Sequence, residues 1–322
     1  MWYNPHAMSA TPKVSVITPA YKAARYIGQA IESVQAQTLT DWEMIIVDDA
    51  SPDETAAVVE RYLDDPRIKL IRSERNRGEC GARNLALEAA QGEWIAVLDA
   101  DDWFAPERLE HLWRFAQEKG ATVVADLQLQ IDDAGKTYGV SFPSHLSPPM
   151  QPIYYSAREY LYHHIPMQPF AFHEHILLHR LKYPEGVVLG GDFIFQVQLV
   201  LHAFGVWILP EPTYLYRVYP TSMFSLYGHD IVKVNQMFDI LASLDGIRND
   251  AELVRCVEVA RKRFLLPIRY RKFVQSIRSG QLRAAWHHFS IDVAAMLVKR
   301  MPGAVYRRLR AHEKVKNSRE EF

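Results

Sequence analysis

Short apolar segments alternate with amphipathic segments along the N-terminal part of the chain. Runs rich in Val, Ile and Leu predict buried strands, and the segments between them have the periodicity of helices. The expected strands cover residues 13–18, 43–48, 67–72, 93–98 and 121–131, and the expected helices cover residues 24–37, 53–64, 80–91 and 106–118. Regular alternation of strand and helix is typical of a mainly parallel sheet with helices on both faces. The sequence therefore predicts an α/β fold.

The pattern becomes less regular after this alternating region. Asp132 to Gly135 has the composition of a hairpin turn, and residues 142–152 form a connection rich in Pro, Ser and His. The further expected elements are a helix over residues 156–164, a helix that begins after Gly190-Gly191, strands over 206–209 and 213–217, and helices from about residue 230 with a kink at Pro267.

Three carboxylates in four residues follow the expected strand 93–98, namely Asp99, Asp101 and Asp102. Like charges at this spacing repel each other beside a low-dielectric sheet, and Mg²⁺ or Mn²⁺ relieves such repulsion by taking oxygen ligands. In open α/β sheets, ligands bind beyond the carboxyl ends of the strands. The alternative is that Asp102 caps a helix that begins near Pro106, although a cap needs only one acid.

A second acidic pair, Asp48 and Asp49, follows another short buried strand. A helix-start signal lies just downstream, where Ser51 or Asp53 can cap the helix expected over residues 53–64. The two upstream acids remain at the carboxyl end of their strand. Two acidic strand ends in one half-domain indicate a shared site.

Four motifs in the same order and spacing resemble those of the family-2 glycosyltransferases. They are VSVITPAY from Val14, VDDAS from Val47, NRG and ARN between Asn76 and Asn84, and LDADD from Leu98. The resemblance is strong over residues 13–115 and looser to about residue 225. It implies a Rossmann-like GT-A catalytic domain over residues 13–228, with a nucleotide-binding half (13–115) and an acceptor half (116–228). An N-terminal arm (1–12) and a helical C-terminal region (229–322) complete the expected organisation.

The resemblance assigns roles to residues of the nucleotide-binding half. It implies that Pro19 and Tyr21 line the nucleoside pocket, that Asp49 hydrogen-bonds the base and that Asp48 supports this loop. The flat face of Tyr21 suits a nucleobase, whereas an isolated Tyr is by default a core or rim residue. Arg83 is implied to touch the donor diphosphate, and the alternative is a solvated arginine on a helix surface.

The acidic segment receives its roles in the same way. The resemblance implies that Asp99, with Ala100, contacts the ribose or the donor sugar. It implies that Asp101 is a direct metal ligand for Mg²⁺ or Mn²⁺. Asp102 is implied to add either a further ligand or a hydrogen bond from outside the ligand set. A nucleotide-diphosphate sugar and a divalent cation are therefore the expected donor and cofactor.

A later segment, Tyr216-Arg217 followed by Ser222, resembles the part of the family that closes over the donor diphosphate. Arg217 is therefore expected to bind the nucleotide sugar. Family members often place a His two residues after this Arg, and Tyr219 stands at that position here. We expect no metal-ligating imidazole from this segment.

Asp192 is the expected general base, because it follows two glycines at the start of an apolar helix and its carboxylate can face the nucleotide cleft. Transfer from a sugar nucleotide requires a carboxylate that deprotonates the incoming hydroxyl. The family often has a Glu-Asp pair here, and Gly191 stands where the Glu would be, which leaves the tuning of the base open. The alternative is that Asp192 is only a helix N-cap.

The composition fits a soluble globular protein, with 48% hydrophobic and 23% charged residues among 322. The two cysteines, Cys80 and Cys256, fit a reducing cytosol and are expected to be small buried groups. Neither a secretory signal nor a membrane span is expected. The histidines at 163, 164, 173, 175 and 179 lack the spacing of a zinc site, so we interpret them as surface or acceptor-cleft residues.

The C-terminal segment from Arg255 is strongly basic, with 17 Lys and Arg against 5 Asp and Glu. Its cations alternate with large apolar residues, as in helices that lie on anionic membranes. We therefore expect peripheral attachment to the cytoplasmic face of a membrane. The alternative is a helical bundle whose basic side chains pair with the acidic half of the chain. Nucleic acid is not an expected partner, because the acidic half would repel phosphate.

These observations predict an inverting glycosyltransferase that moves a sugar, expected to be UDP-linked, to a glycan or lipid-linked acceptor. The resemblance implies a place in bacterial exopolysaccharide or cell-envelope polysaccharide synthesis, as for succinoglycan-type enzymes. One alternative is a sugar nucleotidyltransferase, although its glycine-rich basic loop is missing at Thr18 to Tyr21. Another is a catalytically silent module that binds sugar nucleotides, against which the retention of both the acid cluster and Asp192 argues.

Overall fold

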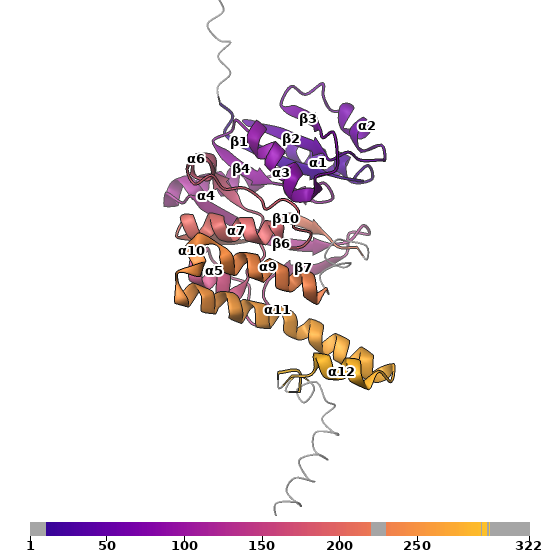
Figure 1. Ribbon diagram of the computed structural model, residues 1–322. Helices are drawn as coiled ribbons and strands as arrows, with labels where there is room; N and C mark the ends of the chain where they lie inside the picture. Colours follow the sequence, from indigo (N-terminus) through magenta and orange to yellow (C-terminus); the bar gives the residue numbers. More distant parts are fainter. Residues whose placement is uncertain (1–10, 220–229, 291, 295, 297–322) are drawn as a thin grey trace, which may run out of the picture. The chain divides into compact units, whose positions relative to one another are not determined.

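The computed structural model describes residues 11–219 and 230–296, apart from residues 291 and 295 (Figure 1). The chain divides into two compact units, residues 1–258 and 259–322. The division falls within the long helix α11 (Ala251–Arg278). The predicted domain limits after residues 12 and 228 stay predictions, and Ser222 and the part of the basic C-terminal segment from residue 297 lie outside the described residues.

A ten-stranded sheet, counted over the described residues, forms the centre of the first unit in the order β3-β2-β1-β4-β9-β6-β10-β5, with β7 beside β6 and β8 beside β10. β3, β2, β1 and β4 are parallel neighbours, as are β6 and β10, whereas β9 is antiparallel to both β4 and β6. The strands are β1 (Val14–Ala20), β2 (Trp42–Asp48), β3 (Ile68–Arg72), β4 (Trp94–Val97), β5 (Trp103–Phe104), β6 (Val123–Ile131), β7 (Thr137–Ser141), β8 (Ile153–Ser156), β9 (Phe170–Phe172) and β10 (Gly205–Arg217).

The helices of the first unit connect these strands. They are α1 (Ile27–Gln35), α2 (Thr55–Glu60), α3 (Gly78–Ala89), α4 (Arg108–Lys119), α5 (Ala157–His163), α6 (His173–Leu178), α7 (Gly191–His202), α9 (Ile231–Ser243) and α10 (Asp245–Arg248). In the second unit, α12 (Leu282–His288) follows the end of α11. None of the helices described here is long and apolar enough to cross a membrane.

The structure confirms the predicted α/β class, the alternating strands and helices of the first 120 or so residues, and the hairpin at Asp132–Gly135 between β6 and β7. The two late strands expected over 206–209 and 213–217 are one strand, β10, whose register shifts between Leu209 and Tyr214. The short strands β5, β8 and β9 carry no sequence signal of their own. α11 continues through Pro267, where the sequence predicts a kink.

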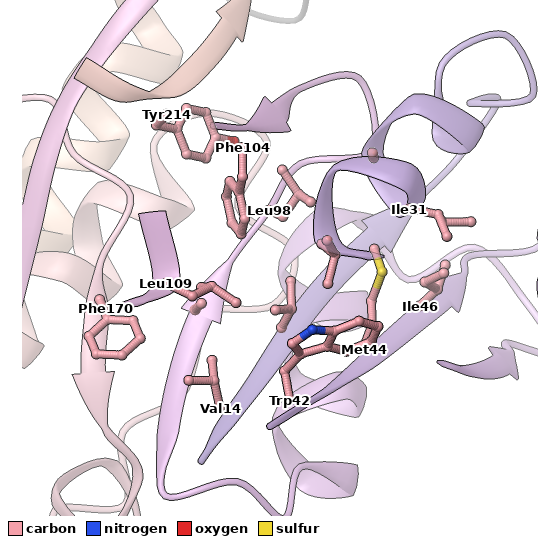
Figure 2. Close-up of a cluster of buried hydrophobic side chains, with 14 of the residues drawn as sticks. Val14, Ile31, Trp42, Met44, Ile46, Leu98, Phe104, Leu109, Phe170 and Tyr214 are labelled. Atoms are coloured by element: carbon pink, nitrogen blue, oxygen red, sulfur yellow. The ribbon is translucent and has the colours of Figure 1, made fainter. Parts of the chain in front are cut away.

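The core lies on both faces of the parallel part of the sheet, because successive side chains of a strand point to opposite faces. On one face, Val14, Met44 and Ile46 lie in a cluster with Ile31 of α1 and with residues of α4 (Figure 2). On the other face, α3 contacts β1 and β2 through its buried apolar side. Both faces are therefore covered, as parallel strands require.

A buried ion pair fixes the start of α4 to the sheet. Arg108 and Asp126 are 0% and 1% exposed, and Arg108 Nε and Nη2 donate to the Asp126 carboxylate at 2.8 to 3.2 Å. Thr213 of β10 also donates to this carboxylate. The Arg108 guanidinium lies over the rings of Phe104 and Tyr214, so the pair joins α4, β5, β6 and β10.

We expect Asp126→Ala to lower the free energy of unfolding by about 3–5 kcal/mol, because it leaves the Arg108 charge buried without its partner. The matched control is Glu110→Ala, on the same helix. Glu110 pairs with Arg114, which is 71% exposed, and a pair of this kind contributes about 0–1 kcal/mol. Urea unfolding followed by circular dichroism measures both variants. Equal midpoints for the two variants would show that the buried pair does not hold α4.

Candidate active site

The carboxyl ends of β1, β2 and β4 lie side by side, because these three strands are parallel neighbours. Ala20 at the end of β1 is in register with Asp48 at the end of β2, and the Asp49 N–H donates to the Ala20 carbonyl at 2.9 Å. The acidic segment Asp99–Asp102 begins just beyond β4. One edge of the sheet thus collects Pro19, Tyr21, Asp48, Asp49, Asp99 and Ala100.

At this edge of the sheet, Tyr21 is exposed and Asp49 is buried. Tyr21 is 47% exposed, so it is a rim residue with an accessible ring and not a core residue. Asp49 is 2% exposed, and both of its carboxylate oxygens accept the backbone N–H of Arg77, at 2.8 and 3.0 Å. Asp49 therefore ties the end of β2 to the start of α3.

The three acids of the acidic segment have different partners. Asp99 accepts from Arg83 Nη2 at 2.5 Å and from Gln168 Nε2 at 2.8 Å. Asp101 Oδ2 accepts from the Tyr219 hydroxyl at 2.7 Å. Asp102 is 2% exposed, and its two oxygens accept from the Tyr214 hydroxyl and from the Arg217 N–H, both at 2.7 Å. These partners come from α3, from β10, from the segment just beyond β10 and from the segment that precedes β9.

The electrostatics of this segment are unfavourable for its acids. Burial, and then the negative charge of Asp99, raise the pKa of Asp101 above its ordinary value. Burial and the charges of Asp101 and Asp99 raise the pKa of Asp102 well above its ordinary value. Asp102 does not cap α4, whose N-cap residue is Glu107. Its contacts to β10 make it a structural anchor of the acidic segment.

Arg217 at the end of β10 holds the acidic segment from the opposite side. Its Nε donates to the Asp101 carbonyl at 2.7 Å, and its Nη1 and Nη2 donate to Asp133 and Gln29, both at 2.5 Å. The residue is 5% exposed, and its guanidinium lies over the ring of Trp103 at 4.6 Å. All three guanidinium nitrogens therefore have partners within the protein.

Arg83 of α3 is the cation nearest to Asp99. It is 1% exposed, and its Nη2 lies 2.5 Å from Asp99 Oδ1 and 2.6 Å from Glu79 Oε1. The predicted alternative of a solvated helix arginine is thus wrong. The Arg83 charge lowers the pKa of Glu79, but partial burial and the charges of Asp99, Asp192 and Asp101 outweigh it and raise that pKa to about 7.

Asp192 is the second residue of α7 and lies in its first turn, after the N-cap residue Gly190. It is therefore not the helix N-cap that was the alternative interpretation. The preceding residue, Gly191, lies so close to α3 that a Cβ there would come within 2.2 Å of Cys80 Sγ, so Asp192 lies beside the start of α3. The same helix carries Arg83, which pairs with Asp99, although these residues come from segments far apart in the sequence.

Asn84 positions the start of α7 indirectly. Its side chain donates to the Tyr183 carbonyl and accepts from the Tyr183 N–H, both at 2.9 Å. An ion pair of 2.9 Å between Arg77 and Glu185 adds a second tie between α3 and the same segment. The segment that leads into Asp192 is thereby held along α3.

The residues present are compatible with a divalent cation that shares its coordination with a phosphorylated ligand. The described residues contain no group of three or more His, Cys, Asp or Glu that could hold a metal ion. Mg²⁺, however, is commonly bound through one or two carboxylates together with substrate phosphates and waters. Asp101 is the acid of the cluster whose side chain has the fewest hydrogen bonds in the described structure.

Sequence reasoning did not assign several residues that the structure brings into this site. They are Glu79, Asn84, Gln168, Tyr214 and Tyr219 in its role as a donor to Asp101. Asn84 lies within the ARN motif, which was a signal for it. Gln168 and Tyr214 carry no local signal, because their roles depend on contacts with residues 69 and more than 100 positions away.

Comparison with known proteins agrees with this architecture. The succinoglycan biosynthesis protein ExoO of Rhizobium meliloti is 28% identical over 314 residues, which cover 91% of this chain and 88% of that protein. The structure of TarS from S. aureus in complex with UDP-GlcNAc has a TM-score of 0.59 at 21% identity and covers 85% of this chain and 89% of its own. The mannosyltransferase PcManGT from Pyrobaculum calidifontis, in complex with GDP-Man and Mn²⁺, has a TM-score of 0.61 at 18% identity and covers 94% and 83%.

At these identities the two structural similarities show the shared fold. The family itself is shown by the sequence. The family model described as Glycosyl transferase family 2 matches residues 15–178, half of the chain, and this range includes the edge of the sheet where the acids gather. Asp192 and Arg217 lie beyond the matched range. The chain belongs to glycosyl transferase family 2.

Proposed function

We propose that this protein is an inverting glycosyltransferase that transfers a sugar from a nucleotide-diphosphate donor to a hydroxyl of a glycan or lipid-linked acceptor. The observation that carries the proposal is the gathering of Asp99 and Asp101 just beyond β4, with the buried Arg83 of α3 paired to Asp99 and the start of α7, which carries Asp192, packed against α3. Asp99 and Asp101 supply carboxylates near a divalent cation, Arg83 supplies a positive charge for the diphosphate, and Asp192 supplies a separate carboxylate for proton transfer.

The donor in this proposal is a UDP-linked hexose. Tyr21 offers an exposed ring for a nucleobase, and Pro19, Asp48 and Asp49 lie at the neighbouring ends of β1 and β2. The structural neighbours TarS and PcManGT were solved with UDP-GlcNAc and with GDP-Man. Both complexes support a nucleotide-sugar donor, with either uracil or guanine as its base. The similarity to ExoO along nearly the whole chain supports a role in exopolysaccharide or cell-envelope polysaccharide synthesis.

We assign the Mg²⁺ or Mn²⁺ ion of this proposal to Asp101. When bound, the ion would stabilise the negative charge of the leaving diphosphate. Asp102 would support the ion indirectly, since both of its oxygens already hold β10 to the acidic segment. Asp99 and Ala100 would face the ribose and the donor sugar, and Arg83 the diphosphate. Arg217 would bind the nucleotide sugar beside the acidic segment, which it also keeps in place through its contact with the Asp101 carbonyl.

Asp192 acts as the general base in this proposal. Its carboxylate accepts the proton of the acceptor hydroxyl while the hydroxyl oxygen forms a bond to the anomeric carbon. The bond between that carbon and the diphosphate oxygen breaks in the same displacement, and the diphosphate leaves with the electron pair. A single displacement inverts the anomeric configuration. Asn84 contributes by holding the segment that leads to Asp192.

Replacing Asp101 tests the metal assignment. We expect Asp101→Asn to abolish transfer and to remove the part of UDP binding that depends on Mn²⁺, because an amide is a much poorer ligand for a hard cation than a carboxylate. Isothermal titration of UDP with and without Mn²⁺ measures the effect. The control is Asp64→Asn, an exposed acid distant in sequence from the cluster. Full activity of the wild-type protein in excess chelator would rule out the metal.

Replacing Asp192 tests the base. Asp192→Asn keeps the shape of the side chain but cannot accept the proton, so we expect the rate of transfer to fall at least about 100-fold, with UDP affinity nearly unchanged. Transfer from the donor found by thermal-shift screening of sugar nucleotides gives the rate, and NMR of the product gives its anomeric configuration. A variant with the wild-type rate, or a product that keeps the donor's configuration, contradicts the mechanism.

We propose further that the basic C-terminal region attaches the protein to the cytoplasmic face of an anionic membrane. The region from Arg255 onward carries 17 basic and 5 acidic residues. Within the described residues, Lys262, Arg269 and Arg271 of α11 are exposed. A position at the membrane surface would bring the site close to lipid-linked acceptors.

Sedimentation with vesicles tests this attachment. We expect the protein to bind vesicles that contain phosphatidylglycerol, to dissociate from them above about 0.5 M salt, where the Debye length is a few ångströms, and to bind neutral vesicles only weakly. Changing Lys262, Arg269 and Arg271 together to Gln is expected to weaken binding. The same change at the exposed residues Lys22, Arg61 and Arg75 of the first unit is the control. Equal, salt-insensitive binding to both vesicle types would favour the internally paired bundle.

A further inference from the structure

Glu79, in the first turn of α3, forms an ion pair that the proposed reaction does not use. Its Oε1 lies 2.6 Å from Arg83 Nη2, one helical turn further along. The two partners differ in exposure, because the Glu79 side chain is 53% exposed and that of Arg83 is 1% exposed. Glu79 thus lies between solvent and the guanidinium.

Arg83 is incompletely satisfied in this position. Its Nη2 serves both Glu79 and Asp99, whereas its Nε and Nη1 are buried and have no hydrogen-bond partner. A buried guanidinium with unused donors gains free energy when an additional acceptor reaches it. A diphosphate is such an acceptor, and its direct route to Nη2 is occupied by the two carboxylates.

The two carboxylates are not equally free to move. Asp99 is held on its other oxygen by Gln168, at 2.8 Å, and its side chain is 22% exposed. Glu79 has a longer side chain, and among the described residues its one ion pair is with Arg83. Arg83 favours the ionised form of Glu79, but burial and the charges of Asp99, Asp192 and Asp101 outweigh this and raise its pKa. Glu79 is therefore the acid that an arriving anion would displace most easily.

We propose that Glu79 is an anionic gate on Arg83, which pairs with the guanidinium in the free protein, yields it to the diphosphate of the nucleotide and pairs again as the nucleoside diphosphate leaves. The inference rests on the proposed function and extends it to product release. The exchange of one anion for another keeps the Arg83 charge compensated throughout, which a buried guanidinium requires. Glu79 lowers the affinity for diphosphate and increases the rate at which the product dissociates.

The test compares Glu79→Gln with Glu88→Gln in the binding of UDP and of uridine, both with Mn²⁺. Glu88 lies on the same helix and pairs with the exposed Lys182, so its replacement removes the same charge from α3 without affecting Arg83. We expect Glu79→Gln to bind UDP about tenfold more tightly, mainly through slower dissociation, because the diphosphate no longer competes with a carboxylate. Uridine, which has no diphosphate, should bind both variants and the wild type equally.

Each outcome has a separate meaning. UDP affinity of Glu79→Gln within twofold of the wild type, or an equal gain in uridine affinity, overturns the gate. A similar gain in the UDP affinity of Glu88→Gln assigns the effect to the overall charge of α3, and this result also overturns the gate. If the wild-type protein binds neither UDP nor GDP while it remains folded by thermal unfolding, the proposed function fails, and this result is distinct from a failure of the gate alone.

Discussion

The concentration of negative charge at the carboxyl ends of β1, β2 and β4 is the constraint on which the rest of the site depends. Parallel pairing brings these strand ends together, and each is followed by an acid or lies beside one. Negative charges close together in a partly buried site disfavour each other's ionised form. The pKa of Asp101, which is raised by burial and by the charge of Asp99, illustrates this effect. A stable fold therefore needs a specific partner for each carboxylate.

The protein answers this constraint with donors from elements that are remote in sequence. Tyr214 and Arg217 of β10 bind both oxygens of Asp102, and Tyr219, just beyond β10, binds Asp101. The register of β10 shifts between Leu209 and Tyr214, before these residues. Without this shift, the side chains of Tyr214 and Arg217 would point to the opposite faces of the sheet. The irregularity of β10 is therefore part of how the acidic segment is held.

The sequence predicts the parts of this site that depend on local pattern, and not those that depend on long-range contact. The strand ends, the acids that follow them and the helix that carries Asp192 could be predicted, because hydrophobic periodicity and glycines mark them locally. The burial of Arg83 and Arg217 could not, since it depends on Asp99 and Asp133, which lie on other segments of the chain. The hydrogen bond of Asp102 with Tyr214 likewise could not be predicted, because Tyr214 is 112 positions away.

Gly191 shows how packing and chemistry constrain each other here. A Cβ at this position would lie 2.2 Å from the Sγ of Cys80, so a larger residue requires the Cys80 side chain or the starts of α7 and α3 to shift. The Glu that family members often have at this position is thereby disfavoured on steric grounds. The residue next to Cys80 on α3 is Glu79, so an acid stands beside this contact on α3, where it pairs with Arg83. If Asp192 is the base, as we propose, the acid near it is therefore supplied from α3 instead of α7.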